Sequence, residues 1–408
     1  KGYFLNTTAG TITLNLPAGA AGSIVSVADY AGTWQTNAVT VAANGTEKIG
    51  GVASAPVSLT TEGQSVTLVY VDSTQGWINT MDSTSNVRGS EFMSATVSGA
   101  CNTLTTAPDC ANVKVAKFVG PGTFCVSSTG VCAANNLVSY IVVAGGGGGA
   151  STQGSWGGGG GGAGGYREVV STTSPYTGSP LDGYATPANR ITVSISGYPI
   201  TVGGGGPGGP ACGSGSPGVG GNGNNSIFSC ITSTGGGGGG AGHPGARNQA
   251  AAAGQPGGSG GGATSQYCAS PSGTASGGVG NTPPVTPSQG NPGGTAAPHP
   301  PARDSGGGGG AAAAGGNSSG GPGGNGVPTQ ITGSAVYYAG GAGGGGVPPG
   351  TVGCGSPAGG GGGNGATPGQ AATAGAVNTG GGGGGGAASP ILGQAGGSGI
   401  VIIRYKFQ

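Results

Sequence analysis

Short, uninterrupted glycine runs restrict the fold of this chain more than any other feature of its sequence. The 408 residues include 106 glycines, and the runs contain four to seven glycines each. They lie at residues 145–149, 157–162, 203–206, 235–240, 306–310, 343–346, 359–363 and 380–386. Glycine loses more conformational entropy on folding than any other residue, so such a run is unfavourable in an isolated helix or strand. Because the glycines cluster and do not recur at every third residue, a collagen triple helix is excluded.

Composition favours an ordered glycine domain over a disordered one. Glycine together with 28 prolines makes up about a third of the chain, a fraction that is common in disordered low-complexity sequence. Disordered chains usually carry many charges, however, whereas Asp, Glu, Lys and Arg are only 5% of this chain. We therefore expect the glycine runs to pack against one another.

An extended left-handed helix with three residues per turn, polyglycine II, makes use of the missing side chains. Its N–H and C=O groups point sideways, and only chains without side chains come close enough to pair with them. A seven-residue run would span roughly 22 Å at about 3.1 Å per residue, so several runs could lie side by side. We predict a glycine-rich domain over residues 144–408, built from packed polyglycine-II helices and closed by β-strands.

Residues 1–90 have the pattern of a small β-sandwich. Apolar and polar residues alternate in segments 11–16, 23–27, 38–42 and 65–71, which predicts strands with one buried face. Trp34 and Trp77 supply large core or interface groups. No helical period appears, so we expect an all-β domain here and essentially no α-helix in the chain.

Further strands are predicted at residues 91–143, as a bridge into the glycine-rich domain. Segment 137–143 is apolar and runs directly into the first glycine run, and segment 399–407 mirrors it at the other end of the glycine-rich sequence. We predict that these two strands pair or lie side by side and close the domain at its base. Segments 191–195 and 200–202 are expected to form a hairpin.

Little in the sequence indicates catalysis or a cofactor. A net charge of +1 provides no electrostatic surface for nucleic acid. Matches to the GxGxxG pattern are expected by chance in so much glycine, and none opens a helix. His243 and His299 stand beside prolines in predicted loops, without a catalytic partner or a second metal ligand. We expect a non-enzymatic protein with no metal, no cofactor and no nucleic-acid partner.

The cysteines are even in number and include no CxxC pair, which favours disulfides in an oxidising, extracellular location. They are Cys101, Cys110, Cys125, Cys132, Cys212, Cys230, Cys268 and Cys354. Pairing by proximity in the sequence would give Cys101–Cys110, Cys125–Cys132 and Cys212–Cys230, which leaves Cys268–Cys354. Connectivity does not follow from sequence, so other pairings stay open.

Tyrosines and isolated polar residues between the glycine runs are the candidate binding groups. A tyrosine does not fit between close-packed glycine helices, so it must cap the bundle or face outward. Exposed tyrosine gives a large contact area at low entropic cost, while covering the ends of the helices is the alternative role. The candidates for receptor binding are Tyr176, Asp182, Tyr184, His243, Tyr267, His299, Arg303, Asp304, Tyr337 and Tyr338.

Four segments combine glycine runs with apolar strand sequence: 140–149, 157–165, 199–203 and 396–405. They resemble the glycine-rich domain of phage tail-fibre and virion proteins, and the resemblance covers about residues 92–408. The glycine part is also similar to the polyglycine sandwich of phage tip adhesins, in which loops at the end of a stack of glycine helices contact a host receptor. Segments 27–34 and 68–77 resemble small β domains of aquatic-phage fibres.

The resemblance implies a structural fibre or adhesin component of a bacteriophage virion, located on the virion and therefore extracellular. Its expected partners are a host cell-surface receptor, either a glycan or an outer-membrane protein, and upstream virion fibre or capsid proteins. Analogy with fibres favours a homo-oligomer, specifically a trimer. Two alternatives stay open: a secreted bacterial cell-surface filament assembled by strand exchange through residues 400–407 and, more remotely, an ice-binding or matrix protein.

Overall fold

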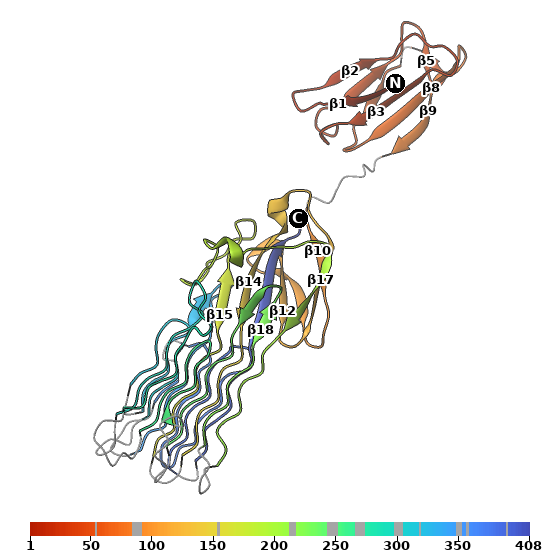
Figure 1. Cartoon of the computed structure of the whole chain (residues 1–408). Helices are drawn as coiled ribbons and strands as arrows, with labels where there is room; N and C mark the ends of the chain where they lie inside the picture. The colour runs from red at the N-terminus through yellow and green to blue at the C-terminus, as the bar shows by residue number, and fades with distance from the viewer. Residues whose placement is uncertain are drawn as a thin grey trace. The chain divides into compact units, whose positions relative to one another are not determined.

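The structure, a computed structural model, divides into two compact units, Lys1–Gly89 and Ser90–Gln408. Each unit is nearly all β, which confirms the predicted fold class at that level (Figure 1). The residues that the structure describes are 1–53, 55–83, 92–152, 156–211, 218–242, 252–265, 274–297, 305–317, 320–347, 353–355, 359–388 and 391–408.

The first unit packs a six-stranded sheet, in the order β1-β3-β8-β9-β5-β6, with a three-stranded sheet, β2-β4-β7. Inward-facing apolar residues of both sheets form one core, in which Trp34 and Trp77 are fully buried. The strands are β1 (Gly2–Leu5), β2 (Ile12–Asn15), β3 (Ile24–Asp29), β4 (Val39–Ala42), β5 (Lys48–Ile49), β6 (Val52–Ala53), β7 (Val57–Leu59), β8 (Ser65–Asp72) and β9 (Gly76–Ser83).

Asp29 fixes the turn that follows β3. Its buried carboxylate accepts hydrogen bonds from the backbone N–H groups of Gly32 at 2.9 Å, Gly63 at 3.1 Å, Thr33 at 3.2 Å and Trp34 at 3.3 Å. Burial by itself raises the pKa of Asp29, but these four N–H groups together outweigh burial and leave the pKa below its ordinary value. The carboxylate is therefore a charged anchor for the turn.

The second unit contains the remaining strands and two short 3-10 helices. They are β10 (Ser94–Val97), β11 (Thr103–Ala107), β12 (Cys110–Phe118), β13 (Gly122–Ser128), η1 (Ala133–Asn136), β14 (Leu137–Val143), β15 (Tyr166–Val169), η2 (Pro187–Asn189), β16 (Ile191–Thr192), β17 (Ser196–Thr201), β18 (Ser226–Phe228), β19 (Ile231–Ser233), β20 (Val327–Thr329), β21 (Val336–Tyr338) and β22 (Ile400–Lys406).

Two sheets of this unit form a sandwich around an aromatic core. The sheet β11-β12-β22-β14-β15 supplies Phe118, Tyr140 and Tyr405, and the sheet β10-β13-β17-β18-β19 supplies Phe124 and Phe228. On its other face the first sheet packs against the hairpin β20-β21 in a second apolar cluster. Each apolar strand is thus buried on both faces, which explains why β14 and β22 are almost uninterrupted in apolar residues.

The predicted pairing of the two bracketing strands is confirmed, whereas the predicted hairpin is wrong. β14 and β22 are antiparallel, with Ser139 opposite Arg404 and Val143 opposite Ile400. Residues 191–192 form β16, which pairs with β14, while β17 lies in the other sheet between β13 and β18. The two segments belong to different layers of the sandwich, a separation that their local sequence pattern does not encode.

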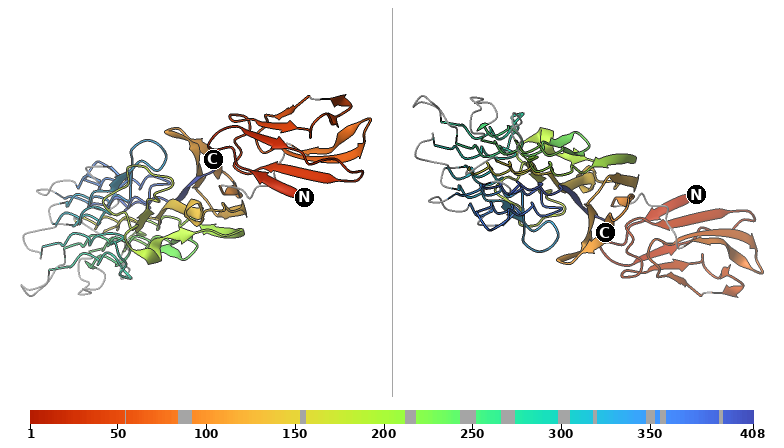
Figure 2. Two further views of the ribbon diagram at one scale, coloured as in Figure 1. Left: turned by 90° about the horizontal axis from the view of Figure 1, so that it is seen from above. Right: turned by 90° about the horizontal axis from the view of Figure 1, so that it is seen from below.

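Beyond the sheets the chain runs in extended glycine-rich segments, here called rods, that lie side by side (Figures 1 and 2). Hydrogen bonds between rods repeat every three residues. In rod 144–152, the N–H groups of Gly145 and Gly148 donate to rod 218–225, those of Gly146 and Gly149 donate to rod 391–399, and that of Gly147 donates to rod 156–165. Partner numbers fall by three as the donor number rises by three, so each of these neighbours is antiparallel to rod 144–152.

Rod 156–165 lies in the interior of the bundle, because it has hydrogen-bonded rods on six sides. Its N–H groups donate to three neighbours and its carbonyl groups accept from three others. Every residue from Trp156 to Val169 is buried. The six neighbouring segments are 144–150, 234–240, 259–262, 306–309, 342–345 and 380–386.

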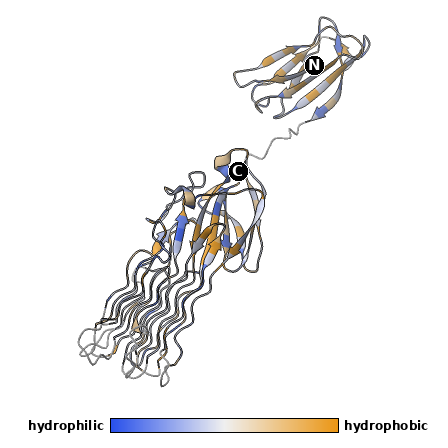
Figure 3. Cartoon of the chain, in the orientation of Figure 1, coloured by the Kyte–Doolittle hydropathy of each residue, from blue (hydrophilic) through white to orange (hydrophobic). Residues whose placement is uncertain are grey.

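Rods at the edge of the bundle show the same period in their exposure. In rod 203–211, Gly204, Pro207 and Pro210 are exposed, whereas Gly206 and Gly209 are buried. Few strongly apolar side chains lie along the rods, which are mostly pale in Figure 3, whereas the strands of the sheets combine strongly apolar with hydrophilic residues. Backbone hydrogen bonds and close packing of backbone therefore hold the bundle together.

A three-residue period is what the polyglycine-II prediction requires, although that helix type itself stays a prediction. One run departs from a uniform rod. Gly359, Gly360 and Gly361 have φ values of +89°, +98° and +80°, in the left-handed region that favours glycine. In this run glycine therefore also serves a change of chain direction.

Candidate functional site

The loop that joins β15 to β16 holds three of the candidate binding residues at the sheet end of the unit. Asp182 is a structural anchor of this loop: its Oδ1 accepts hydrogen bonds from the N–H groups of Val170 and Tyr184, each at 3.0 Å. Tyr184 packs under the guanidinium of Arg190, whose carbon lies 4.3 Å from the ring centre. Arg190 Nε also donates to the Tyr184 carbonyl oxygen at 2.7 Å.

Tyr176 donates a hydrogen bond to Glu168, the buried acid of β15. The Tyr176 hydroxyl lies 3.0 Å from Glu168 Oε1, which also accepts from Thr329 Oγ1 at 2.6 Å. Glu168 Oε2 accepts from the Ser179 N–H at 2.8 Å and from its hydroxyl at 2.5 Å. Burial, followed by the charge of Glu168, raises the pKa of Tyr176 well above its ordinary value. The interactions of Tyr176 that the structure shows are thus internal to the unit.

The two tyrosines of β21 point in opposite directions. Tyr338 is 5% exposed and packs in the second apolar cluster, whereas Tyr337 is 42% exposed. Burial raises the pKa of Tyr338 to about 12. Of the five candidates that the structure describes, Tyr337 is therefore the most accessible. The other five, His243, Tyr267, His299, Arg303 and Asp304, lie outside the described residues.

An ion pair between a buried arginine and a partly exposed aspartate, which the sequence did not reveal, ties the closing strand to three loops. Arg404 of β22 is 1% exposed and binds both carboxylate oxygens of Asp109, each at 2.9 Å. Its guanidinium also donates to the carbonyl oxygens of Ile331 at 3.2 Å and Pro175 at 3.3 Å. Hydrogen bonding by Arg404 lowers the pKa of Asp109. The only sequence signal was a cation within an otherwise apolar strand.

Comparison with known families identifies the second unit. A family model described as "Glycine-rich domain" matches residues 121–406, which is more than half of the chain. The chain belongs to this glycine-rich domain family. A search of curated proteins gives no match. The matched range begins before β13 and extends into β22, so it includes both the rods and most of the sandwich that closes them.

At the rod ends that lie away from the sheets, side-chain hydroxyl groups donate hydrogen bonds to backbone carbonyl oxygens. Ser151 Oγ donates to the Gly209 oxygen at 2.5 Å, and Ser305 Oγ donates to the Gly345 oxygen at 2.5 Å. Thr264 Oγ1 lies 2.6 Å from the Gly240 oxygen and 3.1 Å from the Gly157 oxygen. These buried side chains satisfy backbone groups where the rods end.

Trp156 lies at the same rod ends and is 6% exposed. Its carbonyl oxygen accepts from Thr152 Oγ1 at 2.8 Å and from the Ala388 N–H at 3.0 Å. A Cβ on Gly242 would lie 3.8 Å from its ring. Trp156 therefore packs as a cap beside the glycine rods. The side chains described at these rod ends stabilise the packing of the rods.

The predicted disulfides Cys101–Cys110 and Cys125–Cys132 are absent, because all four thiols are free. The hairpin β11-β12 explains the first case: Thr103 lies opposite Lys117 and Ala107 lies opposite Cys110, so Cys101 and Cys110 are at opposite ends of it. Cys125 lies within β13, opposite Thr96, whereas Cys132 precedes η1.

The remaining predicted pairs, Cys212–Cys230 and Cys268–Cys354, each include one cysteine outside the described residues. Cys230 and Cys354 are described, and both are free and exposed. Across the described ranges, no group of three or more His, Cys, Asp or Glu side chains is placed to hold a metal ion. In the same ranges no helix is long and apolar enough to cross a membrane.

Proposed function

We propose that this chain is the distal, host-contacting part of a bacteriophage fibre. The observation that carries the proposal is the hydrogen-bonded bundle of rods, which the β-sandwich of the same unit closes at one end. Such a bundle is a rigid platform, because each inner rod is held on several sides by backbone hydrogen bonds. Loops on a rigid scaffold are a common way to build a binding surface. The resemblance to phage tip adhesins and the glycine-rich domain family both agree with this function.

The position of β22 favours a fibre tip over a strand-exchanged filament. In such a filament the final strand would complete the sheet of a neighbouring subunit. Here β22 lies between β12 and β14 of its own chain, with six paired positions to β12 and five to β14. Its Arg404 is in addition bound to Asp109 of the same chain. The edge that a donated strand would need is thus already occupied.

The proposed partners are a host surface receptor, either a glycan or an outer-membrane protein, and an upstream fibre or capsid protein of the virion. A homo-oligomer, by analogy a trimer, would present several copies of the receptor-contacting loops. We assign the receptor contact to the segments between rods, where the sequence places His299, Arg303 and Asp304.

Competition for host cells tests this proposal. Purified chain, labelled with a fluorophore, should bind the host bacterium and should reduce adsorption of the virions that carry it. Replacing residues 298–304 with a Gly-Ser segment of equal length should abolish both effects. Ile195→Ser, at an exposed position between β16 and β17 that was not a binding candidate, is the control and should leave both unchanged. Binding that survives the replacement would refute the assignment of the receptor loop, and a chain that neither binds nor competes would refute the function.

A further inference from the structure

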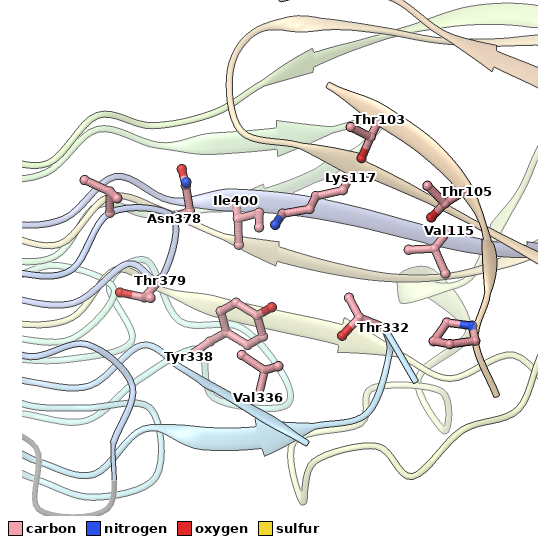
Figure 4. A pocket seen from close by; sticks show the side chains of 12 residues that line it. Thr103, Thr105, Val115, Lys117, Thr332, Val336, Tyr338, Asn378, Thr379 and Ile400 are labelled. Atoms are coloured by element: carbon pink, nitrogen blue, oxygen red, sulfur yellow. The ribbon is translucent and has the colours of Figure 1, made fainter. Parts of the chain in front are cut away.

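A pocket of about 490 Å³ opens at the sheet end of the glycine-rich domain, between the hairpin β11-β12 and the hairpin β20-β21 (Figure 4). Lys117 and Tyr338 reach into it from opposite walls. Thr103 and Lys117 are cross-strand partners, and Thr105 lies opposite Val115, so these four side chains share one face of the β11-β12 hairpin. The rod segment that ends at Asn378 completes the rim.

Lys117 is the only charged residue that lines the pocket. Its ammonium group has no ion-pair partner among the described residues. The nearest acid in sequence to the lining, Asp109, is already bound to Arg404 at 2.9 Å. The pocket therefore presents one uncompensated positive charge, which would attract an anionic group.

Hydroxyl and amide groups surround this charge. In the described part of the chain, the hydroxyls of Thr103, Thr105, Thr332 and Tyr338 have no hydrogen-bond partner. Asn378 uses Oδ1 to accept from Ser398 at 3.2 Å, which leaves its amide N–H groups free to donate. A ligand with several hydroxyl groups of its own would satisfy them.

The floor of the pocket is apolar. Val115 and Ile400 line it and are 5% and 1% exposed, and Val336 and the ring of Tyr338 extend the apolar surface. A sugar ring combines the required properties, because it carries hydroxyls at its edge and C–H groups on its face. The pocket offers polar and apolar groups side by side, as such a ligand requires.

We propose that this pocket binds a sugar that carries a carboxylate, such as a hexuronic acid unit of a polysaccharide. Lys117 pairs with the carboxylate, Asn378 and the hydroxyls bind the sugar hydroxyls, and the side chains of Val336 and Val377 contact the ring face. The inference does not depend on the proposed function, since it concerns the sheet end and not the segments between rods.

Calorimetric titration of the full chain with D-glucuronate tests the proposal, with D-glucose and acetate as comparison ligands. The expected dissociation constant for glucuronate is about 1 mM or tighter, as is usual for a ligand of this size. Glucose, which lacks the charge, and acetate, which lacks the ring, should each bind at least about tenfold more weakly. Absence of glucuronate binding at about 10 mM, or equal binding of glucose or of acetate, would overturn the proposal.

Substitutions in β12 distinguish the effect of losing the Lys117 charge from the effect of disturbing the fold. Lys117→Met should weaken glucuronate binding about tenfold or more, and Lys117→Arg should restore most of it. Lys114→Met is the matched control, because Lys114 lies on the opposite face of β12 with its ammonium 4.6 Å from the Phe407 ring centre. Unchanged binding by Lys117→Met would refute the site. Host adsorption, measured separately, is expected to continue in Lys117→Met if receptor contact lies between the rods, so the two proposals fail independently.

Discussion

One added methyl group in the centre of the rod bundle should cost far more stability than one at its edge. Gly161 lies in the enclosed rod 156–165. A Cβ on it would overlap the carbonyl oxygen of Gly147 and would lie 2.7 Å from the carbonyl carbon of that residue. Non-bonded heavy atoms pack at about 3.5–4.0 Å, so the two rods would have to separate by roughly 1 Å.

A separation of this size breaks the hydrogen bonds beside the substitution. Gly147 donates to Gly162 at 2.8 Å and Ala150 donates to Gly159 at 3.0 Å. Each lost bond leaves buried polar groups without a partner, at a cost of about 1–3 kcal/mol. Alanine restricts the unfolded chain more than glycine does, which offsets about 0.4–1 kcal/mol. Gly161→Ala should therefore lower the free energy of unfolding by about 2–5 kcal/mol.

Gly204→Ala is the matched control within another rod. Gly204 is exposed, and the nearest atom to a Cβ there is Asn224 Nδ2 at 3.7 Å, an ordinary contact. Its stability should stay within about 0.5 kcal/mol of the parent chain. Scanning calorimetry of the full chain measures the difference, and hydrogen exchange of peptides 144–152 and 157–165 locates it. Equal melting and equal exchange in the two variants would refute the close-packing argument.

Three further predictions concern the charges and the thiols. Because the folded-state pKa of Asp29 is below its ordinary value, its contribution to stability is complete above about pH 5 and is lost as the pH falls below about 4; Asp29→Asn should flatten this dependence in thermal melts of the first unit. Asp109→Ala should lower the free energy of unfolding by about 2–4 kcal/mol in urea, since it leaves Arg404 buried without its carboxylate, and a cost under about 0.5 kcal/mol would contradict that reasoning. The exposed thiols of Cys125 and Cys230 should react with a maleimide in the folded protein, and recovery of either in a disulfide-linked peptide would show the prediction wrong.

The closure of the glycine-rich domain could be predicted because two apolar strands bracket the glycine runs. Their apolar character and their place on either side of the glycine runs predicted that they pair or lie side by side, and β14 and β22 do pair. The placement of β17 could not be predicted in this way. It depends on pairing with β13 and β18, which belong to the other sheet from the one that β16 joins, and local alternation carries no information about layers.

The candidate binding residues show the same limit at the level of side chains. From sequence alone, a single tyrosine or aspartate between glycine runs is equally compatible with a ligand-binding role and with a role in stabilising a loop. Tyr176 is anchored by Glu168, which in turn accepts from Thr329, 161 residues away in the sequence. Lys117 was not a candidate, because it lies in an alternating strand and only the hairpin β20-β21 turns its exposed face into a pocket.

The place of a rod in the bundle is encoded in what interrupts its glycines. A rod with three residues per turn has three faces, and a rod surrounded on all of them accepts little besides glycine or alanine, as in the buried segment 157–165. A rod at the edge has one free face, where every third residue is released from the packing constraint, as at Pro207 and Pro210. Proline at such a position also lowers the conformational entropy of the unfolded chain, and it has no backbone N–H group that would need an acceptor. Sequence change can therefore be tolerated on the outer faces and between the rods while the buried glycines hold the scaffold.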